Sequence, residues 1–405
     1  MKTKSILIGI VLLAAVSGSL YFFTVNKKHP TPPLLDRQGP ISTTSEWTNT
    51  KKAIEGLQSQ IRQNPSNFKA KLLLALAYMQ EARITGEHPY YYPAALELIE
   101  EVIDDSPKDD PIKYEATVAK ASVMLSLHHF KEALEIGNEI VKNNSQHADI
   151  YGVLCDANVE LGHYDKAIEA ADKMVSIKPD LRSYSRISYL REIHGDSEGA
   201  IDAMKLAVSA GFPGLEQTAW TRVNLAKLYE KKNDFANAEL QYKIALDETP
   251  HYAFAVAGLA RIEAQKKNYK EAIALYKKAE DIIPEFSFTE ELAELYEKMG
   301  QKELAKTEAT RVIGMLEEDA DAGHFVDLEM ANLYAKFLKD YDKALEYANV
   351  EYDKRPDNID VNKCLAFIYL KKNDIEKAKE FMKVATKTNK QDPELAELSK
   401  LISLK

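Results

Sequence analysis

The feature that most constrains this chain is the regular spacing of nine alanines. Neighbouring alanines lie, by subtraction, 38, 34, 33, 38, 34, 33, 39 and 34 residues apart. They are Ala95, Ala133, Ala167, Ala200, Ala238, Ala272, Ala305, Ala344 and Ala378. A period near 34 residues is typical of stacked helical pairs, each of which buries its apolar face only against its neighbours. The spacing therefore predicts an all-α solenoid of about nine helical hairpins.

One period shows why helical pairs are expected. The segment 223–250 reads VNLAKLYEKKNDFANAELQYKIALDETP. Small Ala226 and Ala238 are expected where two antiparallel helices touch, because larger side chains would hold the backbones apart. Asn233–Asp234 carries the turn chemistry that separates the helices, and Pro250 stops the second helix. Apolar residues at helical spacing on both sides of the turn supply the buried stripes.

Small residues at these places and a closing proline resemble the tetratricopeptide repeat. The resemblance extends over about 47–390, which is most of the chain. It implies a right-handed superhelix in which the first helix of each unit lines a concave face, and it implies binding of other proteins. The stretch 183–223 is also similar to one in a group of exported or membrane-anchored bacterial proteins with these repeats.

Both ends of the array are expected to be capped, because a stack leaves an apolar face open at each end. Residues 46–66 repeat the pattern of a second helix alone and predict a half-repeat cap. Nine units are expected over 67–390, and residues 391–405 predict a closing helix that starts at an Asp-Pro pair.

The first unit departs from the regular spacing. Ala75 precedes Ala95 by 20 residues, where later units have 12. We expect the excess to form an extended turn over 84–93, which contains three consecutive tyrosines. These tyrosines are expected to plug the hairpin, with a binding lip as the alternative.

Residues 1–28 predict a signal anchor. Ser5–Val25 is a run of 21 residues without a charge, which as a helix would span roughly the hydrocarbon thickness of a bilayer. The alternative is a cleaved signal peptide. Residues 29–45 contain four prolines and predict an extended tether. We expect a single-pass protein of the bacterial inner membrane with a periplasmic array; secretion after cleavage and a cytosol-facing array are the alternatives.

The charge balance constrains the partners. The chain has 63 acidic and 53 basic residues and a net charge of −10. Such an array repels polyanions as a whole, so protein or peptide partners are expected and nucleic acid is not. The two cysteines, Cys155 and Cys364, are expected to be buried free thiols because they lie in units far apart in the stack.

The family resemblance places ten candidate partner-binding residues on the concave face. They come from the first helices of the fourth to seventh units. They are Arg182, Arg186, Tyr189, Trp220, Asn224, Lys227, Phe254, Arg261, Glu290 and Glu294.

Four of these residues form the strongest candidate cluster. Arg186, Asn224, Lys227 and Arg261 come from three neighbouring units, and together they could hold a carboxylate and a peptide amide. The cluster resembles the carboxylate clamp of some tetratricopeptide proteins, although the order of residues in that clamp is not reproduced. Alternatively, these are solvated side chains that pair with nearby acids such as Glu230.

The function expected from these observations is a membrane-anchored scaffold or adaptor. Its groove would bind a protein segment and help to assemble an envelope complex. The alternative is a glycan- or small-ligand-binding protein of the envelope, in which Tyr189, Trp220 and Phe254 would stack on the ligand.

Motifs that would indicate catalysis, a cofactor or a metal are lacking in the sequence. It has no phosphate-binding glycine loop, no Gly-x-Ser-x-Gly elbow and no His-Glu-x-x-His. His128 and His129 are expected in a turn between helices, and 319–323 reads as an acidic helix end rather than a calcium loop. We therefore expect a protein without enzymatic activity, cofactor or metal.

Overall fold

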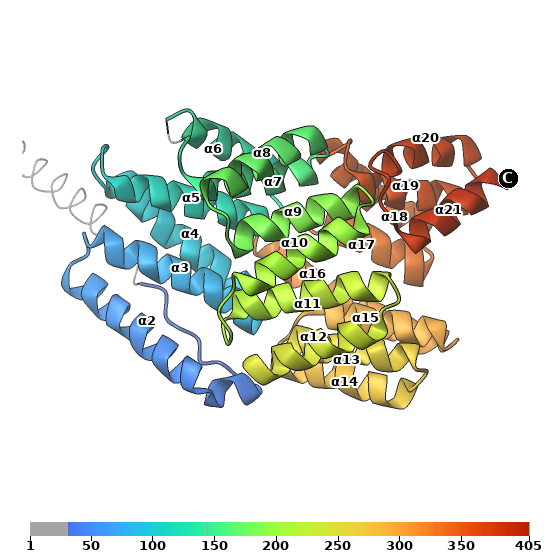
Figure 1. Ribbon diagram of the computed structural model, residues 1–405, viewed down its shortest axis with the longest axis horizontal. Coiled ribbons are helices and arrows are strands. Elements are labelled where there is room, and N and C mark those ends of the chain that lie inside the picture. Colours follow the sequence, from blue (N-terminus) through green and yellow to red (C-terminus); the bar gives the residue numbers. More distant parts are fainter. Residues whose placement is uncertain (1–30, 144, 405) are drawn as a thin grey trace, which may run out of the picture.

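The computed structural model describes residues 31–143 and 145–404, and all regular secondary structure in this part of the chain is helical, without a strand. Figure 1 shows the helices stacked side by side in chain order. The elements are η1 (Gly39–Thr43), α2 (Ser45–Gln63), α3 (Phe68–Thr85), α4 (His88–Asp105), α5 (Pro111–Ser126), α6 (Phe130–Val141), α7 (Ala148–Glu160), α8 (Tyr164–Ile177), α9 (Leu181–Ile193), α10 (Ser197–Ser209), α11 (Glu216–Lys231), α12 (Phe235–Glu248), α13 (Ala253–Gln265), α14 (Tyr269–Ile282), α15 (Phe286–Lys298), α16 (Lys302–Asp321), α17 (Asp327–Leu333), η2 (Tyr334–Leu338), α18 (Tyr341–Lys354), α19 (Ile359–Lys371), α20 (Ile375–Ala385) and α21 (Pro393–Ser403).

Consecutive helices pair into nine units, from α3 with α4 to α19 with α20. Each of the nine regularly spaced alanines lies in the second helix of a unit and is at most 1% exposed. Their small side chains therefore lie in close helix contacts, and the predicted all-α solenoid of helical pairs is confirmed.

Each of the nine turns inside the units contains one residue in the left-handed backbone region, with φ between 57° and 82°. These residues are Gly86, His128, Gly162, Gly195, Asn233, Lys267, Gly300, Lys339 and Asn373. Such a residue ends the first helix and reverses the chain within a few residues. An aspartate then caps the second helix in four units by accepting a backbone hydrogen bond near its start, as Asp234 does from the amide of Asn237.

The first unit differs from expectation at its turn. Helix α4 already begins at His88, so the expected extended turn over 84–93 is wrong: Tyr90, Tyr91 and Tyr92 lie within the helix. Tyr91 is fully buried, and its ring lies 5.4 Å from that of Tyr78 on α3. The tyrosines extend the hydrophobic core of this unit.

The residues expected to form a tether pack onto α2 and the first unit from Pro32 onwards. Arg37 is buried and forms ion pairs with Glu81 of α3 and Glu46 of α2, each at 2.6 Å. The side-chain amide of Gln58 donates to the carbonyl of Pro32. The structure thus differs from the expectation of a free tether, because a buried arginine fixes this segment.

None of the helices in 31–143 and 145–404 combines the length and apolarity needed to cross a bilayer. The run Ser5–Val25, where the sequence predicts an anchor, lies outside the described residues. The anchor therefore stays a prediction.

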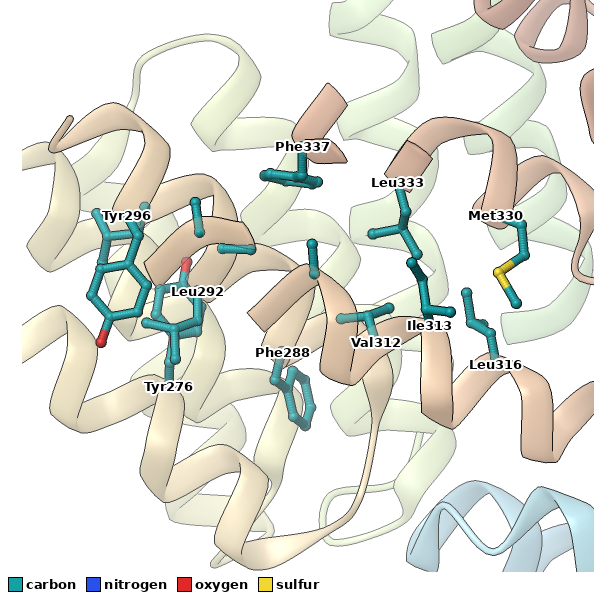
Figure 2. Packing of buried hydrophobic residues seen from close by; sticks show 14 of the residues in the cluster. Tyr276, Phe288, Leu292, Tyr296, Val312, Ile313, Leu316, Met330, Leu333 and Phe337 are labelled. Atoms are coloured by element: carbon teal, nitrogen blue, oxygen red, sulfur yellow. The ribbon is translucent and has the colours of Figure 1, made fainter. Parts of the chain in front are cut away.

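The largest core cluster lies in the C-terminal half and continues without interruption from one unit to the next. Figure 2 shows Phe288 and Leu292 of α15 near Val312 of α16, with Leu333 and Phe337 above them. The helix after α17 continues as the single π-turn η2. It accommodates one extra residue, because Ala331 precedes Ala344 by 13 residues instead of 12.

Successive turns of the superhelix touch, at a nearly constant separation along the chain. The ring of His128 contacts the carbonyl of Phe325, 197 residues later, and the hydroxyl of Tyr164 accepts from the amide of Ile359, 195 residues later. Figure 1 shows α18–α21 beside α7–α9. Dividing 195 by a repeat of about 34 gives roughly 5.7 units for each superhelical turn.

The same kind of contact recurs four times, and we call the whole line of contacts the seam. In the first three contacts a turn inside an early unit meets a connection between two late units, and in the fourth it meets the connection between α20 and the closing helix α21. A Cβ added at Gly86 would lie 3.3 Å from the carbonyl oxygen of Pro284, and one at Gly195 would lie 2.7 Å from that of Asn389. At Gly162 it would lie 2.3 Å from the carbonyl of Asp357. The second turn of the superhelix therefore packs against the first turn along the seam.

Candidate functional site

The two arginines of the predicted cluster are occupied by neighbouring acids. Arg186 donates from Nε and Nη2 to both carboxylate oxygens of Asp156, at 2.8 and 2.6 Å, and from Nη1 to the carbonyl of Arg182. Its guanidinium lies against Gly152, where an added Cβ would be 3.2 Å from it. Such a bidentate pair satisfies most of the donors of an arginine, so little of Arg186 is left for an external anion.

Arg261 is held even more completely. Its Nη1 donates to Glu291 at 2.8 Å, its Nε to Glu230 at 3.3 Å, and its Nη2 to the hydroxyl of Tyr242 at 2.7 Å. The ring of Tyr242 fills the space beside Gly258, where a Cβ would lie only 2.3 Å from it. This network joins three units and reads as structural.

The remaining two members of the cluster are less constrained. The amide of Asn224 donates to the carbonyl of Trp220 at 2.8 Å, one turn earlier in α11. Lys227 is exposed and forms no ion pair within the described part of the chain. Neighbouring side chains partly shield the amine of Lys227 from water. This desolvation, followed by the nearby charge of Arg261, lowers the pKa of Lys227. Of the three cations in the predicted cluster, only Lys227 is thus left without an ion-pair partner in the described part of the chain.

The predicted aromatic residues separate into two groups. Trp220 and Tyr189 are 44% and 40% exposed, so each offers a face to a ligand. Phe254 instead packs edge-on against Phe288, with ring centroids 5.1 Å apart. Arg182 is exposed and lies 3.7 Å from Asp149, which makes it a weakly bound surface charge.

The predicted acidic residues, Glu290 and Glu294, lie on α15, and their surroundings disfavour the ionised form of both carboxylates. Burial, followed by the charge of Glu294, raises the pKa of Glu290 to about 7. Burial also raises the pKa of Glu294, although Lys336 lies 3.4 Å away and opposes the shift. Acids whose pKa rises in this way gain from an added cation.

A cavity of about 370 Å³ opens where the two superhelical turns meet. Its walls come from the second and third units on one side and from the eighth and ninth units on the other. The lining residues are Leu125, Ser126, His128, Phe130, Asp156, Glu160, Leu328, Glu329, Arg355 and Asp360. We refer to it as the inter-turn cavity.

Negative charge dominates this cavity, since four carboxylates and one guanidinium line it. Glu160 is paired with Arg355, Asp156 with Arg186 and Asp360 with Lys390. Glu329 has no ion-pair partner among the residues described here, and burial raises its pKa to about 7.

Arg355 does not neutralise the cavity, because it is shared between Glu160 and the buried Glu351 of α18. Leu125, Phe130 and Leu328 supply an apolar wall beside these charges. The combination suits a cationic head on an apolar stem, such as a lysine or arginine side chain.

Sequence reasoning missed the inter-turn cavity. Asp156, Glu160 and Asp360 occupy first helices and could have been placed on the concave side. They lie close to Glu329 only because units almost 200 residues apart are in contact, and no local sequence pattern predicts that contact.

Groups of three or more histidine, cysteine, aspartate or glutamate side chains able to hold a metal ion do not occur among residues 31–143 and 145–404. Cys155 and Cys364 are both buried and free. Burial raises the pKa of Cys155 and raises that of Cys364 to about 12, so both thiols stay protonated and unreactive near neutral pH.

The described part of the chain forms an α-solenoid of paired helices. The family model of the tetratricopeptide repeat matches residues 223–285, and a second model of the same repeat matches residues 338–402. The chain is a tetratricopeptide-repeat protein, and such repeats indicate a scaffold for interactions between proteins.

Several solved structures resemble this chain in part. A thermophilic tetratricopeptide protein of Thermus thermophilus is 22% identical, with 51% of this chain and 99% of that chain covered and a TM-score of 0.41. A tetratricopeptide protein of Parabacteroides merdae is 14% identical (67% and 98% covered, TM-score 0.44). Human IFIT1, solved as a dimer with PPP-AAAA, is 12% identical (86% and 97%, 0.48). A comparison with curated proteins gave no match.

Proposed function

We propose that this protein is a scaffold that binds a segment of a partner protein on the inner face of its repeats and anchors a basic side chain of that segment in the inter-turn cavity. The observation that carries the proposal is Glu329. It is a half-buried carboxylate on the cavity wall that forms no ion pair in the described part of the chain. The nearby Arg355 is already paired with Glu160 and Glu351, and burial keeps the pKa of Glu329 raised to about 7.

The charge of the cavity selects the kind of partner. A lysine or arginine head placed between Glu329 and Glu160 would return both carboxylates towards their ordinary pKa, and its stem would cover Leu125 and Leu328. An acidic segment would meet only repulsion there. The net charge of −10 favours the same choice and disfavours nucleic acid.

The test compares two labelled peptides that differ only in carrying lysines or glutamates on an alanine-rich backbone, with fluorescence anisotropy as the readout. The full-length chain should bind the lysine peptide and not its glutamate counterpart. Glu329→Gln should weaken that binding roughly tenfold, as expected for loss of one partner in a half-buried charge pair.

Glu271→Gln is the matched control, because Glu271 is exposed on α14 and does not line the cavity. This variant should bind the lysine peptide as the unmodified chain does. Equal affinity of the Glu329→Gln and unmodified chains, or equal binding of both peptides, would remove the basis of the proposal.

Binding of a glycan or small ligand is a second candidate, favoured by the exposed faces of Trp220 and Tyr189. Thermal-shift measurements with oligosaccharides separate the two candidates. A shift with a glycan that disappears in Trp220→Ala, without any effect of the lysine peptide, would favour this second function.

We further propose that the array acts at a membrane as an adaptor in envelope assembly and is not an enzyme. The support is the uncharged run Ser5–Val25, and the array follows it closely because residues from Pro32 onwards pack onto α2 and the first unit. Full-length protein should stay in the membrane fraction after alkaline washing, and Leu13→Arg should release it. Release of the unmodified chain, with a mass that lacks the first residues, would instead indicate a cleaved and secreted form.

A further inference from the structure

The second contact of the seam is built largely from histidines. The α5–α6 turn and the α16–α17 connection exchange three hydrogen bonds: the amide of Phe325 donates to Leu127 at 3.0 Å, His128 donates from Nδ1 to Phe325 at 2.8 Å, and His129 donates from Nε2 to Gly323 at 2.8 Å. The ring of His129 also stacks on Phe325, with centroids 4.0 Å apart. We call this contact the histidine junction.

A third histidine lies inside the junction without any polar partner. The ring of His324 stands edge-on to that of His128, with centroids 4.3 Å apart. Both of its nitrogens are buried, and neither has a hydrogen-bond partner in the described part of the chain. A charged imidazolium there would lose its hydration and gain nothing in return.

The charged and titratable groups that surround the junction come from five helices. From the end of α18, Lys354 lies 3.7 Å from the ring centroid of Phe325, and Arg355 lies 4.9 Å from that of Phe130. Glu160 of α7 and Glu351 of α18 pair with Arg355. On the other side, Glu132 of α6 lies 3.7 Å from His129, and Asp319 of α16 interacts with His88 of α4.

We propose that the histidine junction is an acid-sensitive latch, which holds the two superhelical turns together at neutral pH and releases them when protons bind its imidazoles. Closing the junction buries His128 and His324 side by side, next to two cations, so the closed state accommodates only neutral rings. Opening returns both rings to water, where they can accept protons.

The sign and size of the effect follow from linkage. Burial lowers the pKa of His128 to about 4 and that of His324 to about 3, from an ordinary value of 6.5. The closed state is therefore favoured above pH 6.5 and loses that advantage as the pH falls towards 4. At pH 5 each of the two groups shifts the equilibrium roughly thirtyfold towards opening.

Asp319 acts in the opposite direction. Burial raises its pKa to about 6, so its protonation favours the closed state as the pH falls. At pH 5 this opposes opening roughly tenfold, which leaves a net shift of about a hundredfold.

Hydrogen exchange of the full-length chain at about pH 7.5 and pH 5, corrected for the intrinsic exchange rate, tests the latch without any ligand. The amide of Phe325 should lose protection by up to about a hundredfold at the lower pH, while amides in the middle of α11 keep theirs. Unchanged protection of Phe325 would overturn the proposal.

The decisive variant is His128→Asn combined with His324→Leu, which removes both titrating rings. Asn fits the left-handed backbone of position 128, because Asn233 and Asn373 occupy the same place in other units. Protection of Phe325 should then no longer fall with pH. Should the double variant not fold, His128→Asn alone should still reduce the pH effect roughly thirtyfold.

His251→Asn is the control, since His251 is exposed and also has a left-handed backbone, with φ of 65°. It should keep the full pH response. An equal loss of protection in the double variant and in this control would show that the latch does not reside in His128 and His324.

Discussion

Replacing Arg37 by methionine should destabilise the N-terminal end of the array severely. The side chain of Arg37 is 1% exposed, and its guanidinium donates twice to Glu81, whose side chain is fully buried, at 2.8 and 2.6 Å. Removing the cation leaves a buried carboxylate unpaired, which typically costs about 3–5 kcal/mol. Because repeat arrays unfold unit by unit, we expect this loss mainly in η1, α2 and α3.

Hydrogen exchange combined with urea unfolding measures the effect. Arg182→Met is the control, because Arg182 is 53% exposed and lies 3.7 Å from its acid, so its loss should cost less than about 0.5 kcal/mol. The double variant Arg37→Met with Glu81→Leu should recover most of the stability, since an apolar pair can replace a buried ion pair. If Arg37→Met loses less than about 1 kcal/mol, or the double variant is no better than the single one, the reasoning is refuted.

Two further predictions concern the seam and the acidic face. Gly162→Ala should lower the stability in thermal unfolding more than Gly300→Ala does. Both glycines have positive φ, so alanine at either position loses roughly 1–2 kcal/mol. Only at Gly162 would the new Cβ also clash with Asp357, while at Gly300 nothing in the described part of the chain lies within 4 Å. Equal losses would mean that the seam does not form in solution. Glu290→Gln should raise stability at pH 8 by on the order of 1 kcal/mol and have little effect near pH 4. The raised pKa of about 7 makes the charged form unfavourable in the folded state, and this penalty disappears only below the ordinary pKa of 4.5. An equal effect of the substitution at both pH values would contradict this.

The helical pairs could be predicted because they depend on local signals. A small residue such as Ala238 marks a helix contact within its own unit, and a residue such as Asn233 marks the turn a few positions earlier. Neither signal needs any information from a distant part of the chain. The number of units and their order follow from repeating them.

The seam could not be predicted, because it depends on the rotation between neighbouring units. A small change in each rotation, added over five or six units, decides whether His128 meets Phe325 or misses it. The packed N-terminal segment was missed for a similar reason: Arg37 and Glu81 are 44 residues apart and belong to no common repeat.

For the candidate site, the residues were foreseen better than their partners. Arg186 and Arg261 were expected to face a ligand, but each is held by an acid of an adjacent unit, Asp156 and Glu291, 30 residues away. One repeat of separation could have suggested these pairs. The unbalanced charge of Glu329 could not be foreseen, since it follows from which side chains the second superhelical turn brings to the cavity.

The seam also changes how the array should respond to damage. In an open solenoid each unit contacts only its neighbours along the chain, so a destabilising substitution affects the adjacent units. Here Tyr164 touches Ile359 directly, so units that are neighbours in space are numbered far apart. A substitution in one unit is therefore expected to destabilise two groups of units: its neighbours along the chain and the units that it contacts across the seam.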